Sequence, residues 1–94
     1  MGKVVLSGYI DIPENELEVV ATALENHIEL TRNEVGCLIF EVTQSNELPT
    51  RFIVYEEFTD KTAFENHQAR VKASDWGRVT VNVKRTYRIE EQNV

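Results

Sequence analysis

One stretch, a strand followed at once by a helix, most constrains how this chain can fold. Residues 51–58 read Arg-Phe-Ile-Val-Tyr-Glu-Glu-Phe, an apolar run of strand length rich in β-branched and aromatic side chains. Because both faces of this run are largely apolar, we expect a central strand that is covered on both sides. Asp60 can cap a helix of about residues 61–71, which carries His67. Glu56 interrupts the run, so its carboxylate must be paired, hydrogen-bonded or directed into a polar cavity.

Length and composition limit what the chain can be. Its 94 residues form one domain, with a core expected over about residues 3–89 and a polar tail after it. The net charge of −6 argues against nucleic acid and membranes as partners. The chain has a single cysteine, Cys37, and shows neither a signal peptide nor a long apolar run. These features indicate the cytoplasm. The two histidines lack metal-ligand spacing and the four glycines form no phosphate loop, so we expect no metal and no nucleotide cofactor.

The remaining periodicity predicts the order of the elements. Alternating residues predict three more strands, at residues 3–11, 37–43 and 79–89. An amphipathic stripe predicts a helix over about residues 14–32. Residues 73–77 are expected to form a loop or a short helical turn. The opening half of the last strand could instead extend that turn. The order strand, helix, strand, strand, helix, strand is that of the α+β, ferredoxin-like βαββαβ fold.

Three single residues have local interpretations. Gly8, in mid-strand, indicates the close approach of another backbone, a helix or a ligand, or is a simple packing glycine. His27 lies beside the apolar stripe of its helix and is interpreted as a boundary or surface histidine. Cys37 has no histidine nearby in sequence and is interpreted as a small buried hydrophobic residue.

The face of the sheet opposite the helices is expected to be apolar as well. It carries Val5, Ile39, Ile53 and Tyr55, or their neighbours of opposite parity. Two helices cover only one face of such a sheet, and a second copy of the same sheet is an economical cover for the other. We therefore predict a homodimer.

Three short motifs follow one another in a specific order. Residues 34–40 read Glu-Val-Gly-Cys-Leu-Ile-Phe after a helix ending in Thr-Arg, residues 52–60 read Phe-Ile-Val-Tyr-Glu-Glu-Phe-Thr-Asp, and Ala63 and His67 follow. In this order the chain resembles the antibiotic biosynthesis monooxygenase superfamily, from about residue 4 to residue 88. The resemblance implies a dimeric α+β barrel with a pocket between sheet and helices. The family includes cofactor-independent oxygenases of polyphenols and quinols, haem-degrading enzymes, an isomerase of a phosphorylated signal and proteins of unknown activity.

The resemblance also assigns individual residues. His67 matches a helix histidine that often lines the family's pocket, Glu56 matches a strand carboxylate, and Trp76 falls where pocket aromatics often lie. Similarity to the haem-degrading branch is poor, because Ser7 or Tyr9 takes the place of its asparagine and the tryptophan follows the histidine. Haem degradation is therefore not expected.

A phenol or quinol anion can pass an electron directly to oxygen, so the protein must bind a flat ring, remove a proton and hold the oxyanion. His67, with an ordinary pKa of about 6.5, is the candidate base, and Glu56 is the second catalytic candidate. The candidate substrate-binding residues are aromatic or can stabilise negative charge: Tyr55, Phe64, Trp76, Arg85 and Tyr87. Each catalytic candidate has a structural alternative, namely packing or hydrogen bonding for His67 and a structural hydrogen bond or ion pair for Glu56.

The resemblance and this chemistry predict a cytoplasmic, homodimeric, cofactor-independent monooxygenase of a small quinol or polyphenol. One alternative is an acid–base isomerase of a small, phosphorylated keto sugar, in which His67 and Glu56 shuttle protons between carbons. Another is a protein that binds an aromatic ligand without turnover. A pocket with several converging basic groups would favour the isomerase, and an aromatic pocket favours the oxygenase.

Overall fold

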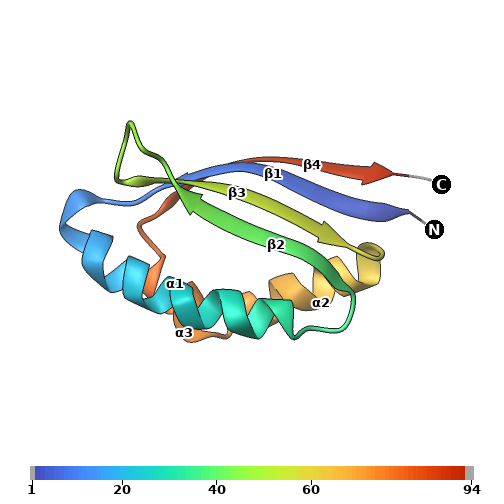
Figure 1. Cartoon of the computed structure of the whole chain (residues 1–94). Helices are drawn as coiled ribbons and strands as arrows, with labels where there is room; N and C mark the ends of the chain where they lie inside the picture. The colour runs from blue at the N-terminus through green and yellow to red at the C-terminus, as the bar shows by residue number, and fades with distance from the viewer. Residues whose placement is uncertain (1, 93–94) are drawn as a thin grey trace.

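A computed structural model describes residues 2–92 as one antiparallel sheet with the helices on a single face (Figure 1). The elements are β1 (Lys3–Asp11), η1 (Glu14–Glu16), α1 (Leu17–Arg32), β2 (Cys37–Gln44), β3 (Arg51–Phe58), α2 (Lys61–Lys72), α3 (Asp75–Val79) and β4 (Lys84–Gln92). The four strands have the order β2-β3-β1-β4. This arrangement confirms the predicted α+β, ferredoxin-like fold.

The core lies between the sheet and α1, α2 and α3. β3 is an inner strand, as predicted, and pairs with β1 on one side and β2 on the other. Residues opposite each other on neighbouring strands share a face, so Leu6 lies on the same face as Glu56, and Ile10 on the same face as Phe52. This inner face and the apolar stripe of α1 form the buried cluster, to which α3 adds Trp76.

The outer face of the sheet mixes apolar with polar and charged side chains, so the prediction of an apolar face holds only in part. Val5, Ser7 and Tyr9 of β1 lie opposite Glu57, Tyr55 and Ile53 of β3. Ile53 is 47% exposed, although it lies in the middle of an inner strand. The homodimer that would cover this face stays a prediction.

The last strand begins later than predicted. Residues 79–83 do not pair with the sheet, and β4 starts at Lys84. The hydroxyl of Ser74 accepts a hydrogen bond from the amide of Gly77 at 3.2 Å, which caps α3, and the Thr80 hydroxyl donates to the Trp76 carbonyl at 2.6 Å. These side chains favour helix and turn over strand, so the alternative in which the turn is extended is correct.

The predicted polar tail is partly strand. β4 continues beyond residue 89, and Glu90, Glu91 and Gln92 lie opposite Val5, Val4 and Lys3 of β1. Charged side chains are compatible with this position because β4 is an edge strand, and the backbone of β1 supplies its hydrogen-bond partners. The rest of the predicted tail lies outside the described residues. Within residues 2–92 the structure has no helix that is both long and apolar enough to cross a membrane.

Local irregularities change which way some β2 residues face. The register of β2 shifts between Cys37 and Ile39, so Cys37 lies opposite Phe58 on the inner face, while Ile39 lies opposite Glu57 on the outer face. Strict alternation along this strand would place Cys37 and Ile39 on the same face, and the bulge separates them. Cys37 is half-buried rather than buried, and burial raises the pKa of its thiol.

Two glycines permit close approaches that a side chain would block. At Gly8 a Cβ atom would lie 2.0 Å from the Thr86 carbonyl oxygen of β4, and φ is +152°. The predicted close approach of another backbone is therefore confirmed. Gly36 has φ +90° and faces Ala63 of α2, so the turn before β2 packs directly onto that helix.

Candidate functional site

Three ionisable side chains are buried together under the helices. His27 of α1, Glu56 of β3 and His67 of α2 are 5%, 6% and 4% exposed. The two imidazole rings have centroids 6.0 Å apart, and Nε2 of His67 lies 3.9 Å from Oε1 of Glu56. Since an isolated buried charge is costly, each of these groups must be neutral or paired.

His67 is held by a carboxylate from the turn after α1. Oε1 of Glu34 lies 2.6 Å from Nδ1 of His67, and Oε2 of Glu34 accepts a hydrogen bond from Nε of Arg70. Arg70 also donates to the hydroxyl of Thr31 at 3.1 Å. Asp60 caps α2 by accepting from the amide of Ala63, which fixes where the helix begins and hence the face that carries His67 and Arg70.

Glu56 has no such partner. Its Oε1 atom is buried and makes no hydrogen bond within residues 2–92. Burial raises the pKa of Glu56 to about 8, and the negative charge of Glu34 contributes to the increase. Burial also lowers the pKa of His67, although Glu34 opposes this change. At neutral pH the site therefore holds a protonated carboxyl group beside a neutral imidazole.

His27 has an aromatic environment instead. Its ring stacks on the indole of Trp76 with centroids 4.6 Å apart and planes 5° apart, and it meets Phe40 edge-on. Burial lowers the pKa of His27 to about 3, so the ring is neutral. The prediction of a boundary or surface histidine is wrong, because His27 follows Leu24 by three residues on the buried side of α1.

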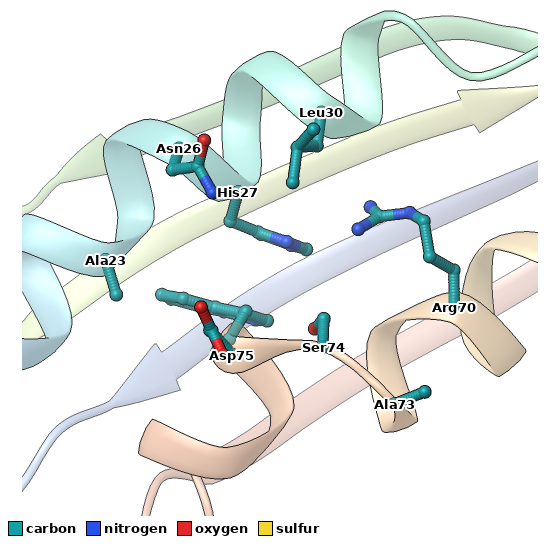
Figure 2. Close-up of a pocket in the computed structure, with 9 residues that line it drawn as sticks. Ala23, Asn26, His27, Leu30, Arg70, Ala73, Ser74 and Asp75 are labelled. Carbon is teal, nitrogen blue, oxygen red and sulfur yellow. The ribbon is translucent and has the colours of Figure 1, made fainter.

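Two cavities meet at this stacked pair. The outer cavity, of about 510 Å³, lies between α1 and the segment from α2 to α3 (Figure 2), and its lining residues include His27, Arg70 and Trp76. The inner cavity, of about 20 Å³, is lined by Glu56 and Tyr87 among others, again with His27 and Trp76. The outer cavity has the size of a small-molecule site, and the inner one has room for a single water-sized group. The His27–Trp76 pair thus separates the outer cavity from Glu56.

The structure brings together some of the predicted site residues. Glu56, Trp76 and Tyr87 all border the inner cavity. Burial raises the pKa of Tyr87 to about 12, so its hydroxyl stays protonated. His67 lines neither of the two cavities and lies behind Glu56.

Three other predicted residues lie elsewhere. Tyr55 is on the outer face of the sheet, where its hydroxyl donates to Glu57. Phe64 packs edge-on against Phe58, with ring centroids 5.6 Å apart, and Arg85 donates to the hydroxyl of Thr80 at 2.7 Å. The aromatic candidates Tyr55, Phe64 and Trp76 therefore do not line one pocket within a single chain, because Tyr55 and its neighbour Glu56 point to opposite faces.

Sequence reasoning missed Glu34 and Arg70. Glu34 precedes its histidine partner by 33 residues, and no local pattern marks it. Gly36, a residue type common in turns, lies close to Glu34 in sequence, but it does not show what the turn packs against. No group of three or more His, Cys, Asp or Glu residues within the part of the chain that the structure describes is arranged to hold a metal ion.

Comparisons with known proteins agree with this fold. The family model described as antibiotic biosynthesis monooxygenase matches residues 3–78. A structure from Nitrosomonas europaea whose name refers to this family is 22% identical, with a TM-score of 0.79 over 97% of this chain and 91% of that one. A similarly named structure from Bacteroides thetaiotaomicron is 23% identical, with a TM-score of 0.78 over 99% and 89% of the two chains. A protein from Shewanella oneidensis is 25% identical, with a TM-score of 0.70 over 96% and 88%. The chain belongs to the antibiotic biosynthesis monooxygenase family.

Proposed function

We propose that the protein is a cofactor-independent monooxygenase that oxidises a small quinol or polyphenol with molecular oxygen. The proposal rests on Glu56, whose buried carboxyl group is protonated and has an oxygen without a hydrogen-bond partner among the described residues. Glu56 lines the inner cavity, and Nε2 of neutral His67 lies 3.9 Å from its Oε1 atom. Family membership supports the class of reaction.

The two cavities suggest how a substrate binds. Its ring lies in the outer cavity, and one hydroxyl group enters the inner cavity beside Glu56, which requires the rings of His27 and Trp76 to part. The carboxyl group of Glu56 moves toward His67, closing the 3.9 Å between its Oε1 atom and Nε2, and passes its proton to Nε2 while it takes up the hydroxyl proton of the substrate. The resulting imidazolium is stabilised by the carboxylate of Glu34 at Nδ1.

Oxygen then reacts with the substrate anion itself. The anion gives one electron to oxygen, and the radical and superoxide combine at a ring carbon to form a peroxide. The imidazolium of His67 returns its proton through Glu56 to the peroxide, and loss of water then converts that carbon into a carbonyl group. Overall a substrate RH2 and oxygen give R=O and water, so one oxygen atom enters the product and the substrate supplies all the electrons.

The charges around the outer cavity favour this substrate class over a phosphorylated sugar. Among the described residues that line it, Arg70 is the only lysine or arginine, and its guanidinium already binds Glu34. Asp75 adds a carboxylate to the same lining. A phosphorylated substrate would need several uncompensated basic groups, whereas the stacked His27 and Trp76 rings suit a flat aromatic molecule.

We further propose that two copies pair through the outer faces of their sheets. Ile39, Ile53 and Tyr55 supply the apolar surface that a second sheet would cover, beside Val5, which is only 9% exposed. Light scattering at micromolar concentration should give twice the mass of one chain, and a stable monomer would contradict the proposal.

Oxygen uptake tests the proposed reaction. Purified, metal-chelated and flavin-free protein is incubated with a panel of reduced quinols and hydroxyanthracenones, beside the Glu56→Gln variant. Glu65→Gln, at an exposed position of α2, is the matched control. We expect catalysed uptake for the wild type and the control, and a loss of about 100-fold or more for Glu56→Gln.

Two results would overturn the proposal. Equal rates for all three proteins across the panel would leave only autoxidation of the quinols. Saturable quenching of Trp76 fluorescence without product would instead identify a protein that binds aromatic ligands without turnover.

A further inference from the structure

Glu34 lines neither cavity, yet it makes the shortest polar contact to the imidazole of His67. Its two oxygens have different partners: Oε1 lies 2.6 Å from Nδ1 of His67, and Oε2 accepts from Nε of Arg70. The side chain is 17% exposed, far less than a free surface glutamate. Glu34 therefore joins the turn after α1 to two residues of α2.

The hydrogen atoms of this group follow from what each side chain can donate. Arg70 has only donors, and an ionised carboxylate has only acceptors. Since the Glu34 carboxylate can only accept, Nδ1 of His67 must carry the hydrogen of that contact. A neutral imidazole has one N–H, so Nε2 is left with a free lone pair on the side of Glu56.

The other groups around His67 do not offer a competing arrangement. Phe40 and Phe58 present aromatic rings, with centroids 6.0 and 4.9 Å from the imidazole. His27 is neutral, and its ring centroid is 6.0 Å away. Glu56 faces Nε2 at 3.9 Å, which is too long for a direct hydrogen bond. Among residues 2–92, only Glu34 is placed to decide which nitrogen carries the proton.

We propose that Glu34 is a positioning residue that holds neutral His67 with its proton on Nδ1 and so directs the basic Nε2 atom at Glu56. The use of that base in turnover rests on the proposed function. The tautomer itself is a property of the folded protein without substrate. This is the same logic by which a carboxylate orients the ring of a catalytic or metal-binding histidine.

Because Arg70 also contacts Glu34, the effect of Glu34→Gln on the tautomer of His67 can be predicted. In Glu34→Gln the side chain has one carbonyl oxygen and one NH2 group in place of two equivalent oxygens. The guanidinium of Arg70 can only donate, so the carbonyl oxygen of the glutamine turns to it and the NH2 group faces Nδ1 of His67. Nδ1 must then accept, and the proton moves to Nε2. Glu34→Gln should thus invert the tautomer, whereas Glu34→Asp keeps a carboxylate and should preserve it.

Nitrogen NMR of protein labelled with ¹⁵N-histidine measures the tautomer directly, because protonated and bare ring nitrogens have well-separated shifts. At neutral pH we expect Nδ1–H for His67 in the wild type, in Glu34→Asp and in the charge-matched control Glu65→Gln, and Nε2–H in Glu34→Gln. The two histidines can be told apart with His27→Phe. A wild-type His67 with its proton on Nε2 would overturn the proposal without any variant, as would a Glu34→Gln spectrum that keeps the proton on Nδ1.

Oxygen uptake with the same proteins separates this proposal from the proposed function. If the tautomer inverts and no protein turns over any quinol, the positioning role stands and the proposed function fails. If quinols are oxidised and Glu34→Gln retains the wild-type rate, the positioning role has no part in catalysis.

Discussion

Two histidines on different helices are buried to the same degree and meet under the sheet, yet their surroundings differ. On α2, His67 has a carboxylate at Nδ1 and a protonated carboxyl group near Nε2. On α1, His27 has an indole on its face and a phenyl ring at its edge, and its Nδ1 atom has no hydrogen-bond partner within residues 2–92.

The difference shows how the neighbours of a buried imidazole decide its use. Burial lowers the pKa of both rings, but Glu34 opposes this only at His67. His67 can therefore accept a proton within the fold, because the imidazolium that forms would be paired. His27 cannot do so at moderate pH, and it serves with Trp76 as a wall between the two cavities.

The largest expected effect comes from Glu56, on the His67 side. Its pKa rises from an ordinary 4.5 to about 8 on folding, so between these values the native state keeps a proton that the unfolded chain releases. The free energy of unfolding should therefore fall as pH rises from 4.5 to 8, by about 4 kcal/mol in total. Urea unfolding across this range should show this loss in the wild type relative to Glu56→Gln, which has nothing to ionise.

The control for Glu56→Gln is Glu65→Gln on exposed α2 surface, which should keep the wild-type slope. A constant difference in unfolding free energy between Glu56→Gln and wild type from pH 4.5 to 8 would contradict a raised pKa. That result would make Glu56 an ordinary carboxylate.

For the second histidine, His27→Phe should increase the stability of the protein at acidic pH. Because the pKa of His27 falls to about 3, the unfolded chain binds a proton below pH 6.5 that the native state does not. Wild-type stability is therefore lost as pH falls, and His27→Phe should gain about 3 kcal/mol relative to wild type between pH 7 and pH 4. Thermal or urea unfolding at the two pH values measures it. The same relative stability at both would mean that His27 is free to protonate in the fold.

Filling the outer cavity should weaken ligand binding without touching the acid–base pair. Ala23 of α1 lines this cavity, whereas Ala69 is exposed on α2 and lines none of the cavities described above. Ala23→Phe should weaken the binding of a flat hydroxyaromatic ligand by about tenfold or more, or about 1.4 kcal/mol, and Ala69→Phe should leave it unchanged. Trp76 is the only tryptophan, so its fluorescence reports the titration. Equal affinities would place the ligand elsewhere.

The smallest expected effect concerns Arg70, which is partly exposed and links Glu34 to Thr31. Replacing it by methionine should cost about 1 kcal/mol of stability, since these contacts are open to solvent on one side. Removing the positive charge should also raise the pKa of both histidines, because Arg70 lowers each of them. A proton NMR titration checks the direction, and a lower pKa for either ring would contradict the charge argument.

The sequence was sufficient for most of the fold because the apolar alternation of β1 and β3 and the stripe of α1 repeat at regular spacing. Elements whose form depends on single side chains were harder to predict. The Ser74 cap and the Thr80 hydroxyl decide where α3 ends and β4 begins, and a one-residue bulge turns Cys37 to the inner face.

The candidate site was predictable only in part, for a related reason. Glu56 was recognisable because a carboxylate in an apolar strand needs an explanation, and Trp76 and Tyr87 do border the same inner cavity. Glu34 was not recognisable, because its contact with His67 depends on how a turn packs onto a helix 33 residues further along the chain. Tyr55 lies on the outer face of the sheet, so it cannot also line a pocket beside Glu56 within one chain, since a strand alternates its faces at every residue.

We expect Glu56 to stay protonated at neutral pH beside a neutral His67. Carbon NMR of protein labelled with ¹³C at the glutamate carboxyl groups measures this directly, with Glu56→Gln identifying the signal. We expect this carboxyl carbon to titrate near pH 8, well above the ordinary glutamate value of 4.5. A Glu56 signal that titrates between pH 4 and 5 would contradict it, because the site would then hold a permanent carboxylate and no proton to relay.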